Sequence, residues 1–247
     1  MKKILSLTFI LVLLAAFGYS KDYDWTYKWS QLPDMEQSGM DIEGTDPTIL
    51  ADDFLCENGL PITDLHWWGS YIGWMEDVDD PNPTGVMPQH PDAFKFSMHM
   101  DVRAGVDAPY SHPGQQIYGH IDNNYNVEYF GTVNHGGVFE HVFQYNYILP
   151  EAWMQEQGLV YWLDLSAIYD TGQPDYRWGW HTSKTQWNDS AVVNSAGTPV
   201  GWVPIADDPI KTDLAFEIST VPEPGAIFLF FLGAIGWFYK RIKNRSN

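Results

Sequence analysis

The densest group of potential metal ligands in the chain is the acidic stretch from Glu76 to Pro83. Asp77, Asp79 and Asp80 lie within it, and aspartates spaced along a turn offer the carboxylate oxygens that Ca²⁺ prefers. The spacing is not that of the helix-flanked calcium loop, because no Gly stands at its sixth position and no Glu at its twelfth. The stretch therefore predicts either a calcium site at these three aspartates or a solvated loop between strands.

Asp52 and Asp53 form a second acidic pair, which we expect to lie in a strand together with Cys56. Adjacent residues of a strand point to opposite faces, so one of the two carboxylates must point inward and needs hydrogen bonds or a cation. We expect a structural role in which that carboxylate accepts backbone N–H groups of a turn, with a calcium ligand as the alternative. Cys56 is the only cysteine, which excludes an intrachain disulfide, and we expect a buried, unreactive thiol.

The tryptophans suggest a different kind of site, because the C–H faces of sugar rings stack on indole rings. Trp178, Trp180 and Trp187 are the set that we expect to be exposed and to bind carbohydrate. The alternative is that most of the tryptophans are packed in the core.

The sequence gives no basis for assigning catalytic residues. It contains no His-Glu-x-x-His, no cysteine pair and no Gly-x-Ser-x-Gly. A glycoside hydrolase needs two carboxylates across a sugar-sized cleft, but in a chain with 32 acidic residues almost any fold would provide such a pair. His66 and His181 stand beside tryptophans and are expected to be half-buried, whereas His99 is expected to be exposed on the polar face of its strand.

The elements that would position these residues are strands. Phe94, Phe96 and Met98 alternate with polar residues, as expected for a strand with one buried face. Similar patterns predict strands at 49–55, 62–74, 94–101, 116–121, 127–133, 138–149, 159–169, 176–182, 191–193, 200–205 and 212–219. Helix is suggested only at 151–157, and residues 21–47 are expected to be a polar lead-in segment with little regular structure. Short strands and turns rich in Gly, Pro, Asn and Asp predict an all-β fold at 48–219, an antiparallel β-sandwich of jelly-roll type, with a β-barrel as the alternative.

Charge excludes one class of function. Removing residues 1–20 and 221–247 takes away six of the 13 basic residues but only one of the 32 acidic residues, which leaves a body with a formal net charge of −24. Such a surface repels nucleic acid, so nucleic-acid binding is excluded. Aromatic residues make up 16% of the chain, and a disordered acidic chain would lack them.

The C-terminal segment has the pattern of a membrane stop. Val221, Pro222, Glu223 and Pro224 precede an apolar run, residues 225–239, which predicts a transmembrane helix. The run would reach about 22 Å as a helix, short of the roughly 30 Å hydrocarbon core, and flanking basic side chains can extend the reach. The cations that would hold the C-terminus in the cytoplasm are Lys240, Arg241, Lys243 and Arg245.

This order of motif, apolar run and basic end resembles the PEP-CTERM sorting domain of exported bacterial proteins, over about residues 221–245. The resemblance implies processing by exosortase, a membrane-embedded cysteine peptidase, and a transient inner-membrane anchor. It also implies an association with extracellular polysaccharide and biofilm matrix, and a cell with two membranes. The basic end departs modestly from the family pattern, because Ile242 and Asn244 interrupt it.

The N-terminal segment agrees with export. Lys2 and Lys3 precede an apolar run, residues 4–17, and small residues follow at a plausible cleavage site. Residues 1–20 therefore predict a signal peptide that is handled by the secretion translocon and removed by signal peptidase, with an N-terminal membrane anchor as the alternative.

The body itself resembles an uncharacterised β-rich domain of exported bacterial proteins, notably of planctomycetes and similar lineages. The segments that carry this resemblance are residues 51–54, 62–70, 105–109, 161–164, 178–180 and 213–216. We therefore expect a non-enzymatic, exosortase-sorted protein of the cell surface or extracellular matrix that contacts polysaccharide. A lectin-like module and a glycoside hydrolase remain as alternatives.

Overall fold

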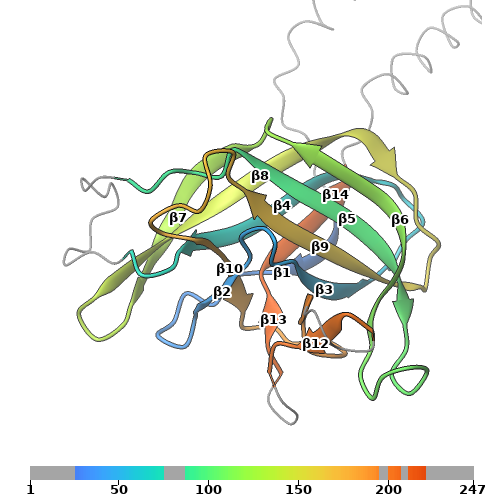
Figure 1. The fold of residues 1–247 in the computed structure, drawn as a ribbon. Coiled ribbons are helices and arrows are strands. Elements are labelled where there is room, and N and C mark those ends of the chain that lie inside the picture. The colour runs from blue at the N-terminus through green and yellow to red at the C-terminus, as the bar shows by residue number, and fades with distance from the viewer. Residues whose placement is uncertain (1–25, 75–86, 195–199, 207–210, 221–247) are drawn as a thin grey trace, which may run out of the picture. The chain divides into compact units, whose positions relative to one another are not determined.

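The computed structural model describes residues 26–74, 87–194, 200–206 and 211–220, and these residues form strands and turns with no helix. All strand pairings are antiparallel and build two sheets (Figure 1). The strands are β1 (Thr26–Gln31), β2 (Asp41–Glu43), β3 (Leu50–Leu55), β4 (Ile62–Tyr71), β5 (Ala93–Val102), β6 (His112–Asp122), β7 (Asn126–Asn134), β8 (Phe139–Trp153), β9 (Val160–Ile168), β10 (Trp178–Ser183), β11 (Val192–Asn194), β12 (Trp202–Pro204), β13 (Asp213–Leu214) and β14 (Phe216–Thr220).

The first sheet has eight strands and is organised around β4. β8 pairs with one edge of β4, and β14 and β10 pair in succession with the other edge. β7 extends the sheet beyond β8, β1 extends it beyond β14, and β2 and β13 pair with β10. β10 is therefore the strand at which the segments near residues 41, 70 and 213 meet.

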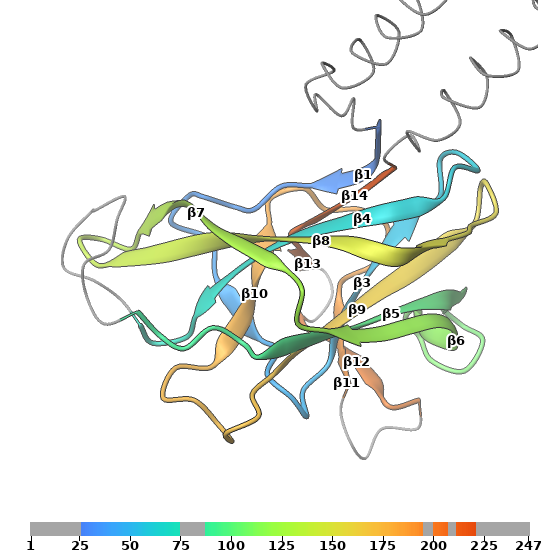
Figure 2. The same ribbon diagram turned by 90° about the horizontal axis from the view of Figure 1, so that it is seen from above.

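The second sheet has six strands in the order β12-β11-β3-β9-β5-β6. Seen from above, β1, β14, β4 and β8 lie in one layer and β3, β9, β5 and β6 in the other (Figure 2).

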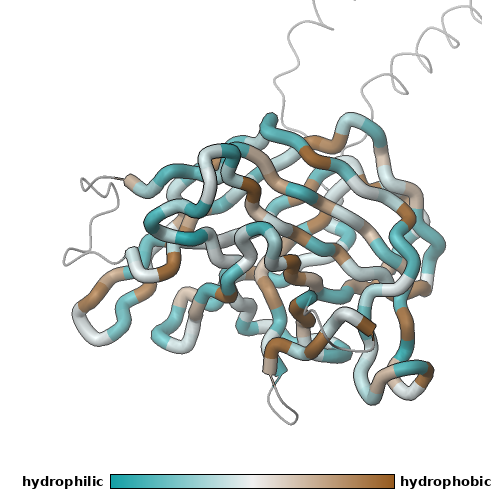
Figure 3. The backbone as a smooth tube through the Cα atoms, in the orientation of Figure 1, coloured by the Kyte–Doolittle hydropathy of each residue, from teal (hydrophilic) through white to brown (hydrophobic). Residues whose placement is uncertain are grey.

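Aromatic side chains fill the space between the two sheets. Trp67 of the first sheet packs edge-on against Phe94 of the second, with ring centroids 4.9 Å apart, and Phe96 stacks on Tyr147 at 4.8 Å. Hydrophobic and hydrophilic stretches alternate along the strands (Figure 3), which is the pattern that gives each sheet one core-facing surface. Contacts at these centroid distances add about 0.5–1.5 kcal/mol per pair to the stabilisation from burial.

Most of the strands predicted from alternation are present, and the buried face predicted for Phe94, Phe96 and Met98 is confirmed. Buried residues alternate in the same way along three further predicted strands: Phe143, Tyr145 and Tyr147, then Tyr161, Leu163 and Leu165, then Leu214, Phe216 and Ile218.

Two expectations about the elements were wrong. Residues 21–47 were expected to have little regular structure, but they contribute two strands to the first sheet, where β1 pairs with β14 and β2 pairs with β10. Helix was suggested at 151–157, but β8 continues to Trp153 and a turn follows. In both places the residues form a strand because they pair with a strand that is distant in the sequence, and local composition does not reveal such pairing.

Several predictions concern residues outside those described. They are the signal peptide at 1–20, the calcium ligands Asp77, Asp79 and Asp80, the sorting residues 221–224, the transmembrane helix at 225–239 and the basic residues that follow it. Within the described part of the chain, no helix is long and apolar enough to cross a membrane.

Candidate functional site

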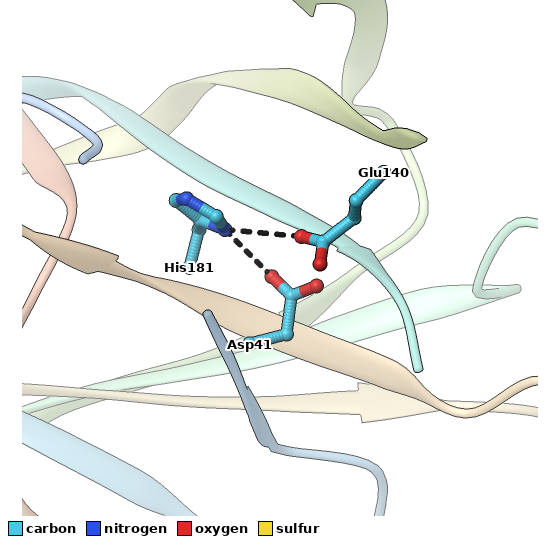
Figure 4. A group of neighbouring side chains, drawn as sticks. All are labelled: Asp41, Glu140 and His181. Carbon is cyan, nitrogen blue, oxygen red and sulfur yellow. Dashed lines mark hydrogen bonds and ion pairs between the residues drawn. The ribbon is translucent and has the colours of Figure 1, made fainter. Parts of the chain in front are cut away.

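Three ionisable side chains from three strands of the first sheet converge on one point: Asp41 of β2, Glu140 of β8 and His181 of β10 (Figure 4). The Nδ1 atom of His181 lies 3.0 Å from Oδ1 of Asp41 and 3.5 Å from Oε1 of Glu140. Asp41 and His181 are direct partners in the register of β2 and β10. The cluster therefore brings together segments that lie about 40 to 140 residues apart in the sequence.

Strand alternation puts His181 on the outer face of the first sheet. Trp180 points into the main core, so the next residue points to the opposite face. That face is nevertheless covered, because the segment between β1 and β2 hydrogen-bonds to β10: the Asp34 N–H donates to the Thr182 carbonyl at 2.9 Å and the Met40 N–H donates to the Thr182 hydroxyl at 3.1 Å. His181 is consequently 0% exposed.

Gly39 allows this covering segment to lie close to the histidine. A Cβ atom at this position would come within 1.9 Å of the Asp34 carbonyl oxygen and 2.8 Å of His181 Nε2. A larger residue at position 39 would therefore displace the segment that covers the cluster.

Two further side chains hold the carboxylates in place. The Ser70 hydroxyl of β4 is within hydrogen-bonding distance of both acids, 3.1 Å from Oε1 of Glu140 and also in contact with Asp41. On the other side, Nε2 of His135 lies 3.2 Å from Oε2 of Glu140. The second ring nitrogen of His181, Nε2, lies 3.0 Å from the Asp34 carbonyl oxygen and donates to it. Each of the three clustered side chains is therefore oriented by at least one additional hydrogen bond.

The electrostatics of the cluster follow from burial and from these contacts. Burial lowers the pKa of His181, but hydrogen bonds from the ring to Asp41 and Glu140 outweigh this effect and raise its pKa to about 10. Burial raises the pKa of Asp41 to about 6 despite its contact with His181. For Glu140, burial acts in the same upward direction, but hydrogen bonds with His181, Asp41 and Ser70 outweigh it and lower the pKa to about 2. A positive charge at His181 is therefore strongly favoured by its two neighbours.

The cluster can hold a cation between its three ligand atoms, or a proton on the imidazole. Its side chains are shielded from solvent, with exposed fractions of 4% for Asp41, 8% for Glu140 and 0% for His181. This burial leaves no open face for a polymer substrate at these atoms.

A second group of buried acids lies where β3 meets β13. Asp52 accepts hydrogen bonds from the Leu214 N–H at 2.7 Å and from the Asp53 N–H at 2.9 Å. Its carboxylate holds backbone N–H groups as expected, but these belong to the strands β13 and β3 and not to a turn. Burial, together with Asp213 and Asp53, raises the pKa of Asp52 well above its usual range. Burial also raises the pKa of Asp53 to about 8, although Asn188 donates a hydrogen bond to it at 2.5 Å.

The residues predicted to bind carbohydrate do not form one exposed surface. Trp178 and Trp180 are both 0% exposed and belong to the main core, so the expectation that they are exposed was wrong. Trp187 is half-buried and packs edge-on against Trp29, with ring centroids 4.9 Å apart. The physical reason is that Trp178 and Trp180 share the face of β10 that is turned to the second sheet.

The exposure predicted for His99 and His181 was also wrong. His99 was expected to be exposed, but it is 9% exposed and its Nε2 lies 2.9 Å from Oδ2 of Asp164. His181 was expected to be half-buried and is fully buried. Cys56 is a free, buried thiol, as predicted.

Sequence reasoning missed Asp41 and Glu140 altogether. Asp41 lies in the segment that was expected to have little regular structure, and the residues around Glu140 do not form a recognisable motif. The presence of His181 beside a tryptophan was the one signal that pointed to this region.

Two family models match the chain, and together they cover residues 27–243. The C-terminal residues 220–243 match the PEP-CTERM protein-sorting motif, which is consistent with a protein that is targeted to exosortase. No curated protein matches the chain. Residues 27–219, more than half of the chain, match a domain of unknown function (DUF7901), and the chain therefore belongs to the DUF7901 family.

Proposed function

We propose that the protein is delivered by its C-terminal signal to the cell surface or extracellular matrix, where its acidic β-domain makes a non-catalytic contact with extracellular polysaccharide. The observation that carries this proposal is the position of the sorting motif, which starts at residue 220, directly after the DUF7901 match. Exosortase would process the tail after a transient stay in the inner membrane. The aromatic core shared by two antiparallel sheets supports assignment of the body to the β-sandwiches of jelly-roll type.

Burial of the perturbed acids supports a non-catalytic role. Catalytic acids and bases have to reach a substrate, but Asp52 and Asp53 are 0% and 1% exposed and the Asp41 cluster is covered as described. The net charge of −24 between residues 21 and 220 suits a protein that stays soluble outside the cell. It also favours neutral polysaccharides, or anionic ones bridged by divalent cations, as binding partners.

Sorting is tested by the mature C-terminus in cells with and without exosortase. We expect mass spectrometry to find a chain truncated near Glu223 in normal cells and an intact tail in the deletion strain. Glu223→Ala should reproduce the deletion phenotype, whereas the matched control Ser246→Ala should be processed normally. An identical C-terminus in both strains would refute the sorting part of the proposal.

Polysaccharide contact is tested separately by co-sedimentation of the mature protein with purified exopolysaccharide from the same cells. We expect sedimentation to depend on polymer concentration, and the degree of polymerisation to stay unchanged during incubation. Release of shorter oligosaccharides would instead indicate a glycoside hydrolase.

A second candidate function is a lectin-like module, and the pairing of Trp187 with Trp29 favours it. Trp187 is the residue of the predicted carbohydrate site that is not in the core, and both it and its neighbour Trp29 are half-buried. Trp187→Ala should weaken glycan-array binding by at least tenfold, while Tyr176→Ala, which removes a 38% exposed aromatic residue elsewhere, should not. Equal binding by both variants would exclude Trp187 from the contact.

A further inference from the structure

We infer that Asp41, Glu140 and His181 form a binding site for one divalent transition-metal ion, of the Zn²⁺ class. The site would be independent of the polysaccharide contact proposed above. It rests on the tautomer of the histidine, on the spacing of the ligand atoms and on the balance of charge.

The hydrogen bond on the far side of the imidazole fixes its tautomer. Nε2 of His181 lies 3.0 Å from the Asp34 carbonyl oxygen, and a carbonyl can only accept, so Nε2 carries a hydrogen. In a neutral imidazole the lone pair is then on Nδ1, which faces the carboxylates of Asp41 and Glu140. A lone pair directed at two anions requires a positive group between them. Histidine ligands of metal ions are commonly oriented in this way, with the second ring nitrogen donating to a backbone carbonyl.

The spacing of the three ligand atoms fits one face of a tetrahedral coordination sphere. Ligands at about 2.0–2.1 Å from Zn²⁺ stand about 3.3 Å apart from one another. The distances from His181 Nδ1 to the Asp41 and Glu140 oxygens are 3.0 and 3.5 Å, on either side of this value. All three ligand atoms lie within 4.8 Å of one another.

Charge favours a divalent ion over a proton. Asp41, Glu140 and a protonated His181 sum to a net charge of −1, and these three side chains are 0–8% exposed. The other histidine in contact with Glu140, His135, is 22% exposed and lies outside this buried group. Burial of an uncompensated charge is unfavourable, whereas two carboxylates, a neutral imidazole and a divalent ion sum to zero. Across the described segments, the ion pairs of Asp41 and Glu140 are formed with histidines, with no Lys or Arg among them.

The donor set indicates the class of ion. A nitrogen and two carboxylate oxygens suit Zn²⁺ and related transition metals, whereas Ca²⁺ takes six to eight oxygen ligands. Ser70 and His135 would act as the outer partners that orient the two carboxylates, a role that such residues have around metal ligands.

The test is a titration of the mature protein, freed of metal by chelation, with ZnCl₂ and with CaCl₂ by isothermal calorimetry and thermal unfolding. We expect one Zn²⁺ per chain with micromolar or tighter affinity and a rise in Tm that Ca²⁺ does not reproduce. Glu140→Gln should lower the Zn²⁺ affinity at least tenfold. Two controls should retain it: Glu128→Gln, an exposed acid of β7, and His99→Gln, which removes a buried histidine that faces one carboxylate only.

X-ray absorption of the Zn²⁺-loaded wild-type protein keeps the proposal testable if Glu140→Gln fails to fold. We expect one imidazole nitrogen and otherwise oxygen ligands. The proposal would be overturned by the absence of stoichiometric Zn²⁺ binding or by a Zn²⁺ affinity that is unchanged in Glu140→Gln. It would also be overturned if the two controls lost as much Zn²⁺ affinity as Glu140→Gln, or if the coordination sphere contained no imidazole.

Discussion

The buried carboxyl group of Asp53 makes the stability of the folded body depend on pH. Asp53 is 1% exposed, one of its oxygens accepts a hydrogen bond from Asn188, and the other has no hydrogen-bond partner among the described residues. Burial, reinforced by the nearby acids Asp213, Asp189 and Asp101, raises its pKa from 3.8 to about 8. The folded state therefore holds a proton at neutral pH that the unfolded chain has lost.

The sign of the effect follows from this difference in pKa. Because the folded pKa is above the unfolded pKa, the folded state binds more protons between pH 4 and pH 8, and the stability due to Asp53 declines as pH rises through this window. One pKa unit corresponds to about 1.4 kcal/mol, so the loss between pH 5 and pH 7 is about 2–3 kcal/mol. Asp53→Asn keeps the shape and the acceptor for Asn188 but removes the titration.

The assay is urea unfolding of the mature wild-type protein and of Asp53→Asn at pH 5 and pH 7. We expect the stability of the variant relative to wild type to rise by about 2–3 kcal/mol between the two pH values, a shift of about 1 M in the urea midpoint. The control Asp170→Asn, at an exposed loop position, should show no such change. Parallel pH curves for wild type and Asp53→Asn would show that the buried group does not take up a proton on folding, and would refute the reasoning.

Three further predictions concern packing. Gly69→Ala places a Cβ within 2.4 Å of the Gly179 carbonyl oxygen and should destabilise by more than about 2 kcal/mol, whereas Gly59→Ala meets no atom within 4 Å and should change stability by less than about 0.5 kcal/mol in chemical denaturation. Trp180→Ala removes a fully buried ring and should lower the free energy of unfolding by about 3–5 kcal/mol, while Trp187→Ala should lower it clearly less. Equal losses of stability in the two variants would contradict the assignment of Trp180 to the core. Cys56 is 1% exposed, so a thiol reagent should modify it only at the rate of unfolding, and rapid labelling of the native protein would contradict its burial.

Alternation along single strands predicted much of the fold. Phe94, Phe96 and Met98 share a buried face because side chains of a strand alternate regardless of which strand lies next to it. The same rule puts Trp178 and Trp180 on one face of β10. It could not indicate which face of that strand is covered, and in the structure both faces are buried.

The candidate metal site could not be predicted in the same way. Asp41, Glu140 and His181 meet because β2 pairs with β10 and because β8 and β10 both pair with β4. Strand pairing brings together residues that are remote in the sequence, and its register is set by the packing of whole sheets.

The sequence by itself determined the export class, the sorting motif at the C-terminus, the acidic charge and the all-β character of the body, because each depends on composition or on short local patterns. The tertiary structure alone decided which acids are buried and which of them meet a histidine. Burial and proximity arise from the packing of the two sheets and of the segment that covers His181. The chemistry available to Asp41, Asp53, Glu140 and His181 is therefore a property of the fold, since the same side chains in an unfolded chain would be ordinary solvated groups.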